Sequence, residues 1–245
     1  MEGPSIAARG RWRSVSEKTM KPWAFIDRWF PNRMAWSRPT YATWLLLLFL
    51  LLAAGPYSLI NHIAAWRGVS VLDVQTSIDS AIPFVPWMFI FYASFYAYFP
   101  ALSWVGAEQS RRLVAEQMNQ RLIQATWVVF ALFLLLPVEV ELRHQIPAME
   151  GVFGSLFASL HAADTPYNAW PSLHVLQSLL IILSLQTWLR QDGRLTPAAL
   201  VVMWSAWALL TASTMMVKQH YVFDVVTGIV IGLLMWRAWF KPVFN

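Results

Sequence analysis

The sequence contains no cysteine, which removes several kinds of chemistry at once. Disulfide bonds, zinc–thiolate sites and a cysteine nucleophile are all excluded. Charged residues are also scarce, at 13% of the 245 residues, whereas a soluble domain usually carries about 25%. The apolar surplus, with 58% hydrophobic residues, must face something other than water. This composition is typical of a polytopic helical membrane protein.

Six apolar segments approach the roughly 20 residues that a helix needs to cross a bilayer. They cover residues 41–60, 84–105, 123–140, 172–189, 198–217 and 221–240. We therefore predict an all-α fold, in which residues 41–245 form a catalytic bundle of six transmembrane helices. Residues 1–40 are polar and basic, so we predict a cytoplasmic or interfacial tail with a short helix around Trp23 to Phe30. The fifteen tryptophans suit the membrane surfaces, where aromatic residues concentrate.

The basic residues are divided unequally between the two ends of these segments. Fifteen of the eighteen lie in the tail, in the loops after the second and fourth segments, or at the C-terminus. The other three are Arg67, Arg143 and Lys218. The positive-inside rule then places both termini in the cytoplasm and the loops 61–83, 141–171 and 218–220 outside. We predict an integral, multi-pass protein of a bacterial cytoplasmic membrane, with its active site facing the periplasm or exterior. The net charge of +5 indicates contact with membrane lipids rather than with nucleic acid.

One polar cluster leads into the fourth segment, and its sequence from residue 164 to 174 is DTPYNAWPSLH. Pro171 followed by Ser172 predicts a helix start, where unpaired backbone N–H groups and the helix dipole suit a phosphate. His174 would lie in the first turn, close to the same position. An ordinary capped helix start with an interfacial histidine explains these residues equally well.

A second cluster, KQHYVFD at residues 218–224, lies between the fifth and sixth segments. His220 and Asp224 are four residues apart, so on a helix they would share one face and touch. A carboxylate beside an imidazole fixes its tautomer and stabilises its cation. A carboxylate one turn inside an apolar helix is costly, which favours a functional role. The alternative is an ion pair between Asp224 and Lys218 that only anchors the helix.

Three other features allow more than one interpretation. Arg143 could bind a phosphate oxygen, because its planar fork suits phosphate geometry, or it could be a solvated loop charge. His62 and His161 have no charged companion at helical spacing and are expected to be interfacial. The aromatic run at residues 84–99 is more typical of lipid-facing packing than of a substrate groove.

The two clusters resemble the sequence blocks of the type 2 phosphatidic acid phosphatase superfamily. Its middle block is Pro-Ser-Gly-His, and residues 171–174 here read Pro-Ser-Leu-His. Its last block is Ser-Arg, five residues, His, three residues and Asp. Ser213, His220 and Asp224 fall in this register, while Thr214 replaces the arginine. The resemblance extends over roughly residues 75–235.

The closest similarity is to the branch that contains inositol-phosphorylceramide-synthase-like members. Leu173 within the middle block and Tyr-Asn at residues 167–168 are both typical of that branch. The first block of the superfamily, Lys, six residues and Arg-Pro, does not occur in this chain. Arg143 lies where a basic residue of that block is expected, but no proline follows it.

The resemblance implies a mechanism that agrees with the residue chemistry. His220 would attack phosphorus while Asp224 holds its ring, and His174 would protonate the departing oxygen. The phosphate-binding residues would be Lys218, Ser172 and Arg143. Neither a metal nor a cofactor is expected, because cations and donors of the protein stabilise the charge. The substrate would be a lipid phosphate taken from the surrounding membrane lipids.

Three functions are compatible with the sequence. The first is a metal-independent lipid phosphate phosphatase with a phospho-histidine intermediate. The second is a phosphotransferase that moves a phospho-headgroup between lipids, or to a sugar or ceramide hydroxyl. The third is a membrane scaffold, or a haem-binding protein that uses His174 and His220. The first two differ only in whether water or an organic hydroxyl reaches the intermediate.

Overall fold

The structure is a computed structural model that describes residues 23–67 and 72–244. Within these residues there are helices and no β-strand, and Val138 and Asn168 form an isolated bridge. The α-helices are α1 (Ala24–Trp29), α2 (Arg38–Phe49), α3 (Gly55–Trp66), α4 (Ser77–Ala81), α5 (Phe89–Ala93), α6 (Phe95–Gly106), α7 (Arg112–Leu135), α8 (Gly151–Ala163), α9 (Leu173–Gln191), α10 (Pro197–Met216) and α11 (Val222–Met235). Shorter 3-10 and π-helical turns connect several of them.

Six helical stretches are long and apolar enough to cross a membrane, as the sequence predicts. They are Arg38–Trp66, Pro86–Gly106, Gln109–Leu135, Leu173–Gln191, Pro197–Met216 and Val222–Phe244. Their outward faces carry exposed apolar side chains such as Leu51, Val201 and Leu234. The expectation of a multi-pass, all-α membrane protein is thereby confirmed. The helix expected near Trp23 is present as α1, while residues 1–22 of the predicted tail lie outside the described residues.

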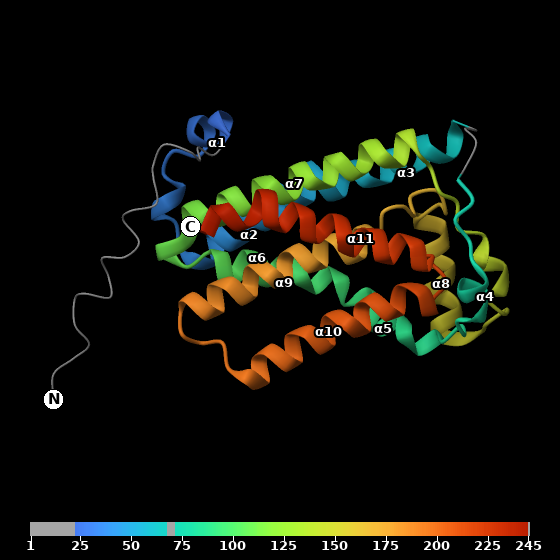
Figure 1. Ribbon diagram of the computed structural model, residues 1–245. Coiled ribbons are helices and arrows are strands. Elements are labelled where there is room, and N and C mark those ends of the chain that lie inside the picture. The colour runs from blue at the N-terminus through green and yellow to red at the C-terminus, as the bar shows by residue number, and fades with distance from the viewer. Residues whose placement is uncertain (1–22, 68–71, 245) are drawn as a thin grey trace.

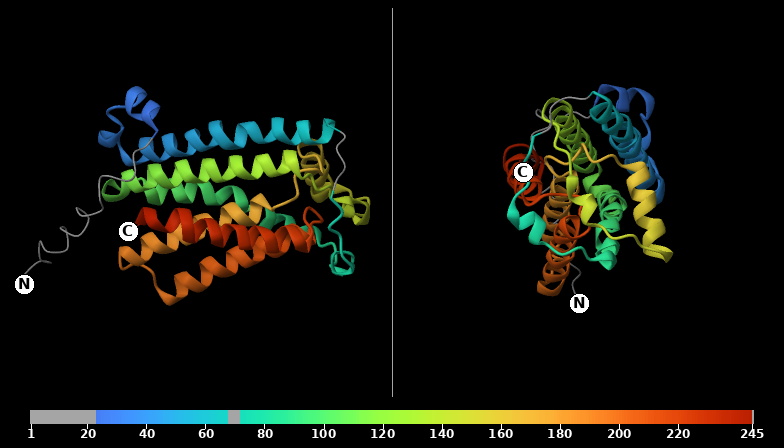
Figure 2. Two further views of the ribbon diagram at one scale, coloured as in Figure 1. Left: turned by 45° about the horizontal axis from the view of Figure 1, so that its top comes forward. Right: turned by 90° about the vertical axis from the view of Figure 1, so that its right-hand side faces the viewer.

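Helix α9 occupies the centre of the bundle. It packs against α6, α7, α10 and α11. Of its most apolar stretch, 61% is buried inside the protein, whereas the corresponding share in the other five spans is 22–50%. The long helices run side by side, with α1 and the end of the last span at one end of the bundle (Figures 1 and 2). The short helices α4 and α8 lie at the opposite end, where the two polar clusters also meet (Figure 1). Residues from the central helix therefore reach the end that carries the candidate site.

The third span begins earlier than the sequence predicts. Apolar residues start at position 123, but α7 already begins at Arg112, because its polar first half is paired inside the protein. Arg33 donates to Glu116 over 2.6 Å, and the Tyr41 hydroxyl donates to the same carboxylate over 2.9 Å. These hydrogen bonds pair charged groups inside the protein that water would solvate if the segment were an exposed loop. The prediction that the second segment is followed by a loop, which would contain Arg111, Arg112 and Arg121, is therefore wrong, because helical turns contain all three.

The first turns of α9 and α11 are joined at the end of the bundle that carries the candidate site. Ser172 caps α9 by accepting a hydrogen bond from Val175 N, which confirms the predicted helix start. The backbone N–H of Ser172 donates to the Asp224 carbonyl of α11 over 3.2 Å. Gly228 permits this close approach, since a Cβ there would lie 3.1 Å from the Ser172 carbonyl oxygen. The two clusters that are distant in sequence are thus joined directly.

Candidate active site

His220 and Asp224 meet at the start of α11. His220 Nδ1 lies 3.5 Å from Asp224 Oδ2, and the two side chains are only 5% and 0% exposed. The spacing predicts that the two residues share a helix face. They do not, because α11 begins only at Val222. Instead, Asp224 turns back toward the helix start, where its Oδ2 also accepts a hydrogen bond from Tyr221 N over 2.8 Å. The pair is therefore positioned by capping of the helix.

The loop before α11 holds His220 in place. Lys218 has a φ of +59°, which reverses the chain directly after α10. The backbone N–H groups of Gln219 and His220 then both donate to the Thr214 carbonyl, over 3.0 and 3.2 Å. Asp79 of α4 accepts from Val222 N over 2.6 Å and fastens the first outer loop to the same turn. This network orders the backbone on both sides of His220.

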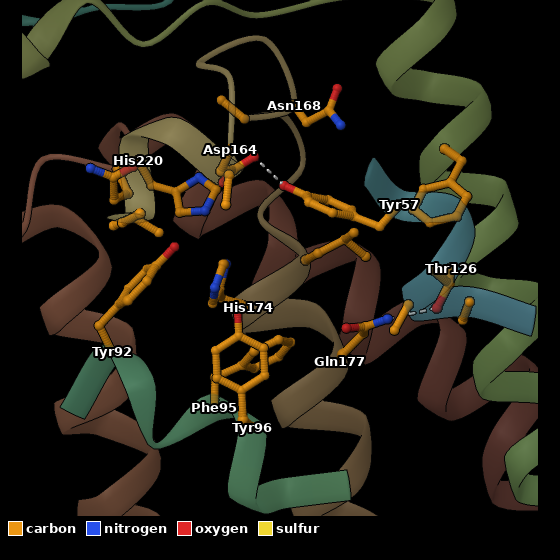
Figure 3. A pocket seen from close by; sticks show the side chains of 18 of the residues that line it. Tyr57, Tyr92, Phe95, Tyr96, Thr126, Asp164, Asn168, His174, Gln177 and His220 are labelled. Carbon is orange, nitrogen blue, oxygen red and sulfur yellow. Dashed lines mark hydrogen bonds between the residues drawn. The ribbon is translucent and has the colours of Figure 1, made fainter. Parts of the chain in front are cut away.

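His174 faces His220 from the first turn of α9. The two ring centroids are 5.6 Å apart, with 67° between the ring planes. Tyr92 stacks on the His174 ring at 4.5 Å, and Phe95 contacts it at 4.4 Å. Figure 3 shows His174 between these aromatic rings and His220. The aromatic contacts restrict the rotation of His174, so its nitrogens keep a defined direction relative to His220.

Both histidines line one cavity of about 280 Å³. Its polar end contains Arg143, Asp164, Asn168 and Gln219 in addition to His220. Its apolar part is formed by side chains of the first, second and third spans, namely Phe49, Leu50, Ala53, Tyr92, Phe95, Tyr96, Phe99 and Phe130. The aromatic residues of the second span therefore line a cavity, although lipid-facing packing is their more typical role. A polar end joined to an apolar chamber suits an amphiphilic ligand.

Arg143 reaches the polar end of the cavity and connects its two sides. Its Nη1 donates to the Asp164 carbonyl and its Nη2 to Gln219 Oε1, both over 2.9 Å. Its buried Nε has no hydrogen-bond partner among the described residues. Burial lowers the pKa of Arg143, against the opposing effect of the Asp164 charge. A guanidinium that lines a cavity and has an unpaired N–H can bind an anion.

The structure does not bring Lys218 and Ser172 into this cavity. The Lys218 side chain is 1% exposed, and its Nζ donates to the carbonyls of Asp79 and Ile82, over 3.2 and 2.5 Å. Burial lowers the pKa of this ammonium group. Ser172 uses its hydroxyl to cap α9 and is fully buried. In this arrangement both side chains stabilise the loops around the site, and Arg143 is the basic side chain that lines the cavity.

Several residues at or behind the cavity wall have no role in the sequence patterns. Tyr57 of α3 lines the cavity, and it and the buried Asn61 donate hydrogen bonds to the Asp164 carboxylate. Asp164 and Asn168 belong to the cluster that precedes α9, yet their residue types alone indicate only a polar loop. Within residues 23–67 and 72–244, no group of three or more His, Asp or Glu side chains is placed to hold a metal ion.

Comparison with known proteins yields one family. A family model described as the PAP2 superfamily matches residues 61–238, which is 178 of the 245 residues. The matched range begins in α3, ends in the last span and contains all the residues of the cavity's polar end except Tyr57. No curated protein and no solved structure matches the chain.

Proposed function

The chain belongs to the PAP2 superfamily, and from this membership and the site geometry we propose that it is a metal-independent lipid phosphate phosphatase. Membership supports a phosphatase-type activity on lipid phosphates. The observation that carries the proposal is the His220–Asp224 pair, which faces His174 across one cavity. This arrangement supplies a nucleophile, a carboxylate behind it that orients its ring, and a general acid.

The first step is an attack by His220 on phosphorus. Because Nδ1 lies beside the Asp224 carboxylate, the proton belongs on Nδ1 and the lone pair on Nε2. A bond forms between Nε2 and phosphorus, and the bond between phosphorus and the lipid oxygen breaks. Asp224 stabilises the positive charge that develops on the ring. His174 donates a proton to the departing oxygen, so the lipid leaves as a neutral alcohol.

The second step regenerates the enzyme. His174, now neutral, takes a proton from a water molecule, and the water oxygen attacks phosphorus as the bond to Nε2 breaks. Arg143 Nε stabilises the phosphoryl oxygens in both steps. The backbone N–H groups of Leu173 and His174 assist it, because the first turn of a helix leaves them without intrahelical partners. Inorganic phosphate and a lipid alcohol are the products.

Metal independence gives the direct test of this function. Purified protein in EDTA should release phosphate from lipid phosphates in detergent or nanodiscs, since Arg143 and the α9 amides supply the stabilising charge. Phosphate release and mass spectrometry of the lipids would measure the reaction. A magnesium-dependent phosphatase in the same buffer should lose its activity. Loss of turnover in EDTA that magnesium or zinc restores would contradict the histidine-nucleophile mechanism.

The proposed orientation places the site outside and residues 1–40 in the cytoplasm. The cysteine-free chain allows a matched test with Ala148→Cys in the loop before α8 and Ala198→Cys at the opposite end of the bundle. Both alanines are exposed. In intact cells a membrane-impermeant maleimide should label Cys at 148 fully, and at 198 only after permeabilisation. The opposite labelling pattern would place the site on the cytoplasmic side.

Transfer to an organic hydroxyl is the second candidate function. It requires the same first step, after which an alcohol takes the place of water at the phospho-histidine. The specific observation that favours it is a carboxylate, Asp164, in the cavity that would hold the phosphate. Neither the attack of His220 on phosphorus nor the attack of water uses an additional negative charge there. The similarity of residues 167–173 to the inositol-phosphorylceramide-synthase-like branch agrees with transfer.

A further inference from the structure

Asp164 is a carboxylate inside a cavity proposed to bind a phosphate. Two negative charges repel each other, and the repulsion grows in a cavity of low dielectric constant. Asp164 orients neither His220 nor His174, since Asp224 lies beside His220 and aromatic rings hold His174. The proposed phosphatase mechanism therefore leaves this residue without a role.

Hydrogen bonds nevertheless hold the Asp164 side chain in one position. Its Oδ1 accepts hydrogen bonds from the Tyr57 hydroxyl over 2.8 Å and from Asn61 Nδ2 over 3.0 Å. Asn61 is completely buried, and its Oδ1 accepts from the backbone N–H and the hydroxyl of Thr165, over 2.9 and 2.8 Å. Helix α3 thus clamps the loop that carries Asp164. A side chain held in this way is preorganised to bind a ligand.

One oxygen of this carboxylate remains available. Both side-chain donors bind Oδ1, whereas Oδ2 accepts no hydrogen bond from the described residues. Burial raises the pKa of Asp164, and the Tyr57 hydrogen bond and the Arg143 charge oppose that shift. A preorganised carboxylate oxygen at a cavity wall is an acceptor for an O–H group.

Asn168 lines the same cavity, and its side-chain amide is also without a partner among the described residues. It is 7% exposed, and neither Oδ1 nor Nδ2 has a hydrogen-bond partner among the described residues. Figure 3 shows it beside Tyr57 on the cavity wall, across from His174. Buried amides without partners are rare in folded proteins and point to a missing ligand or water. A polyol or glycerol group offers the several O–H groups that such a wall can bind.

We propose that Asp164, held by Tyr57 and Asn61, binds a hydroxyl group of an alcohol that lies beside the phosphoryl group. The inference rests on the proposed function, because it assigns the non-phosphate part of the ligand in the same site. The hydroxyl has two sources, the leaving alcohol of the lipid phosphate and a separate acceptor alcohol. Attacking and leaving oxygens lie in line with His220 in the two steps, so both alcohols occupy the same side of the phosphoryl group.

The decisive variant is Asp164→Asn, which keeps the acceptor oxygen for Tyr57 and Asn61 but removes the charge. Two substrates form the first arm: a single-chain lysophosphatidate with one free hydroxyl, and dodecyl phosphate with none. The wild type should show a higher kcat/KM for the lysophosphatidate. In the variant this preference should fall by about tenfold or more, through KM, because hydrogen bonds to charged groups are the strong ones.

The second arm tests an acceptor alcohol. Phospho-enzyme formed from an aryl phosphate is offered glycerol or a monoacylglycerol, and the ratio of transfer to hydrolysis is measured. A tenfold lower ratio in Asp164→Asn would assign the site to the acceptor, and a lower preference in the first arm assigns it to the leaving alcohol. Either result supports the proposal. Asp73→Asn, an exposed carboxylate on a loop outside the cavity, is the matched control and should keep both ratios.

Equal losses on both substrates, with an unchanged transfer ratio, would overturn the proposal, because a structural role lowers all rates together. Unchanged ratios in both arms would also overturn it. Tyr57→Phe keeps the carboxylate and removes one of its hydrogen bonds, so it should shift the same ratios by a smaller factor. If Asp164→Asn does not fold, wild-type ratios in Tyr57→Phe reject the subsite. The proposed phosphatase function is judged separately, by whether wild-type protein forms phospho-enzyme at all.

Discussion

Replacing His220 by alanine is expected to abolish turnover on every phosphate ester, by at least about 10⁴-fold. The covalent intermediate cannot form without Nε2, and no other histidine than His174 lines the cavity among the described residues. The leaving group makes no difference, because a good leaving group does not replace the missing nucleophile. Steady-state rates on a lipid alkyl phosphate and on an aryl phosphate would therefore fall together.

Rapid-quench trapping with labelled substrate measures the intermediate directly. Wild-type protein should carry acid-labile, base-stable phosphate within one turnover, and the His220→Ala protein should carry none. His62→Ala is the matched control, because this exposed histidine of α3 lies outside the cavity lining. Trapped phosphate on the His220 variant would show that another residue is the nucleophile.

The number of spans could be predicted from sequence because a bilayer imposes both length and composition on each helix. The span boundaries could not, wherever polar residues are satisfied inside the protein. The first half of α7 is polar in sequence, yet Arg33 and Tyr41 neutralise its Glu116 from other elements. Helix α8, within the predicted outer loop 141–171, was missed because 13 residues are too few to span a membrane.

In the candidate site, contacts between residues close in sequence could be predicted, and contacts between residues far apart in sequence could not. The proximity of His220 and Asp224 follows from a separation of four residues, even though capping rather than a shared helix face produces it. Ser172 was identified as a helix start, and its hydroxyl is used for that purpose. These features depend on neighbours in sequence, which a single chain reveals.

The position of Lys218 depended on residues that are far away in sequence. Its positive φ turns the side chain toward the carbonyls of Asp79 and Ile82, more than 130 residues earlier. The binding of Asp164 by Tyr57 and Asn61 likewise joins residues separated by more than 100 positions. Neither contact has a periodic or motif signal. The contacts that hold Asp164 at the polar end of the cavity could therefore be found only in the three-dimensional structure.

Replacing His174 by alanine is expected to separate the acid from the nucleophile. A general acid contributes about 10²–10⁴-fold, and its loss matters less when the leaving group is already stable as an anion. His174 has no carboxylate within its helical turn, and it faces His220 across the cavity instead. His174→Ala should therefore lose about 10²–10⁴-fold on a lipid alkyl phosphate and much less on an aryl phosphate.

The trapping experiment gives the two histidines opposite signatures. The His174 variant should still accumulate acid-labile, base-stable phosphate from the aryl substrate, because His220 keeps its Nε2 and its contact with Asp224. The phospho-enzyme should also persist longer than in wild-type protein, since His174 acts as the base that activates water. Phosphate trapped on the His220 variant but absent from the His174 variant would invert the two roles. If neither substitution changed turnover, the enzyme proposal would fail, and a scaffold function would be the explanation that remains for this cavity.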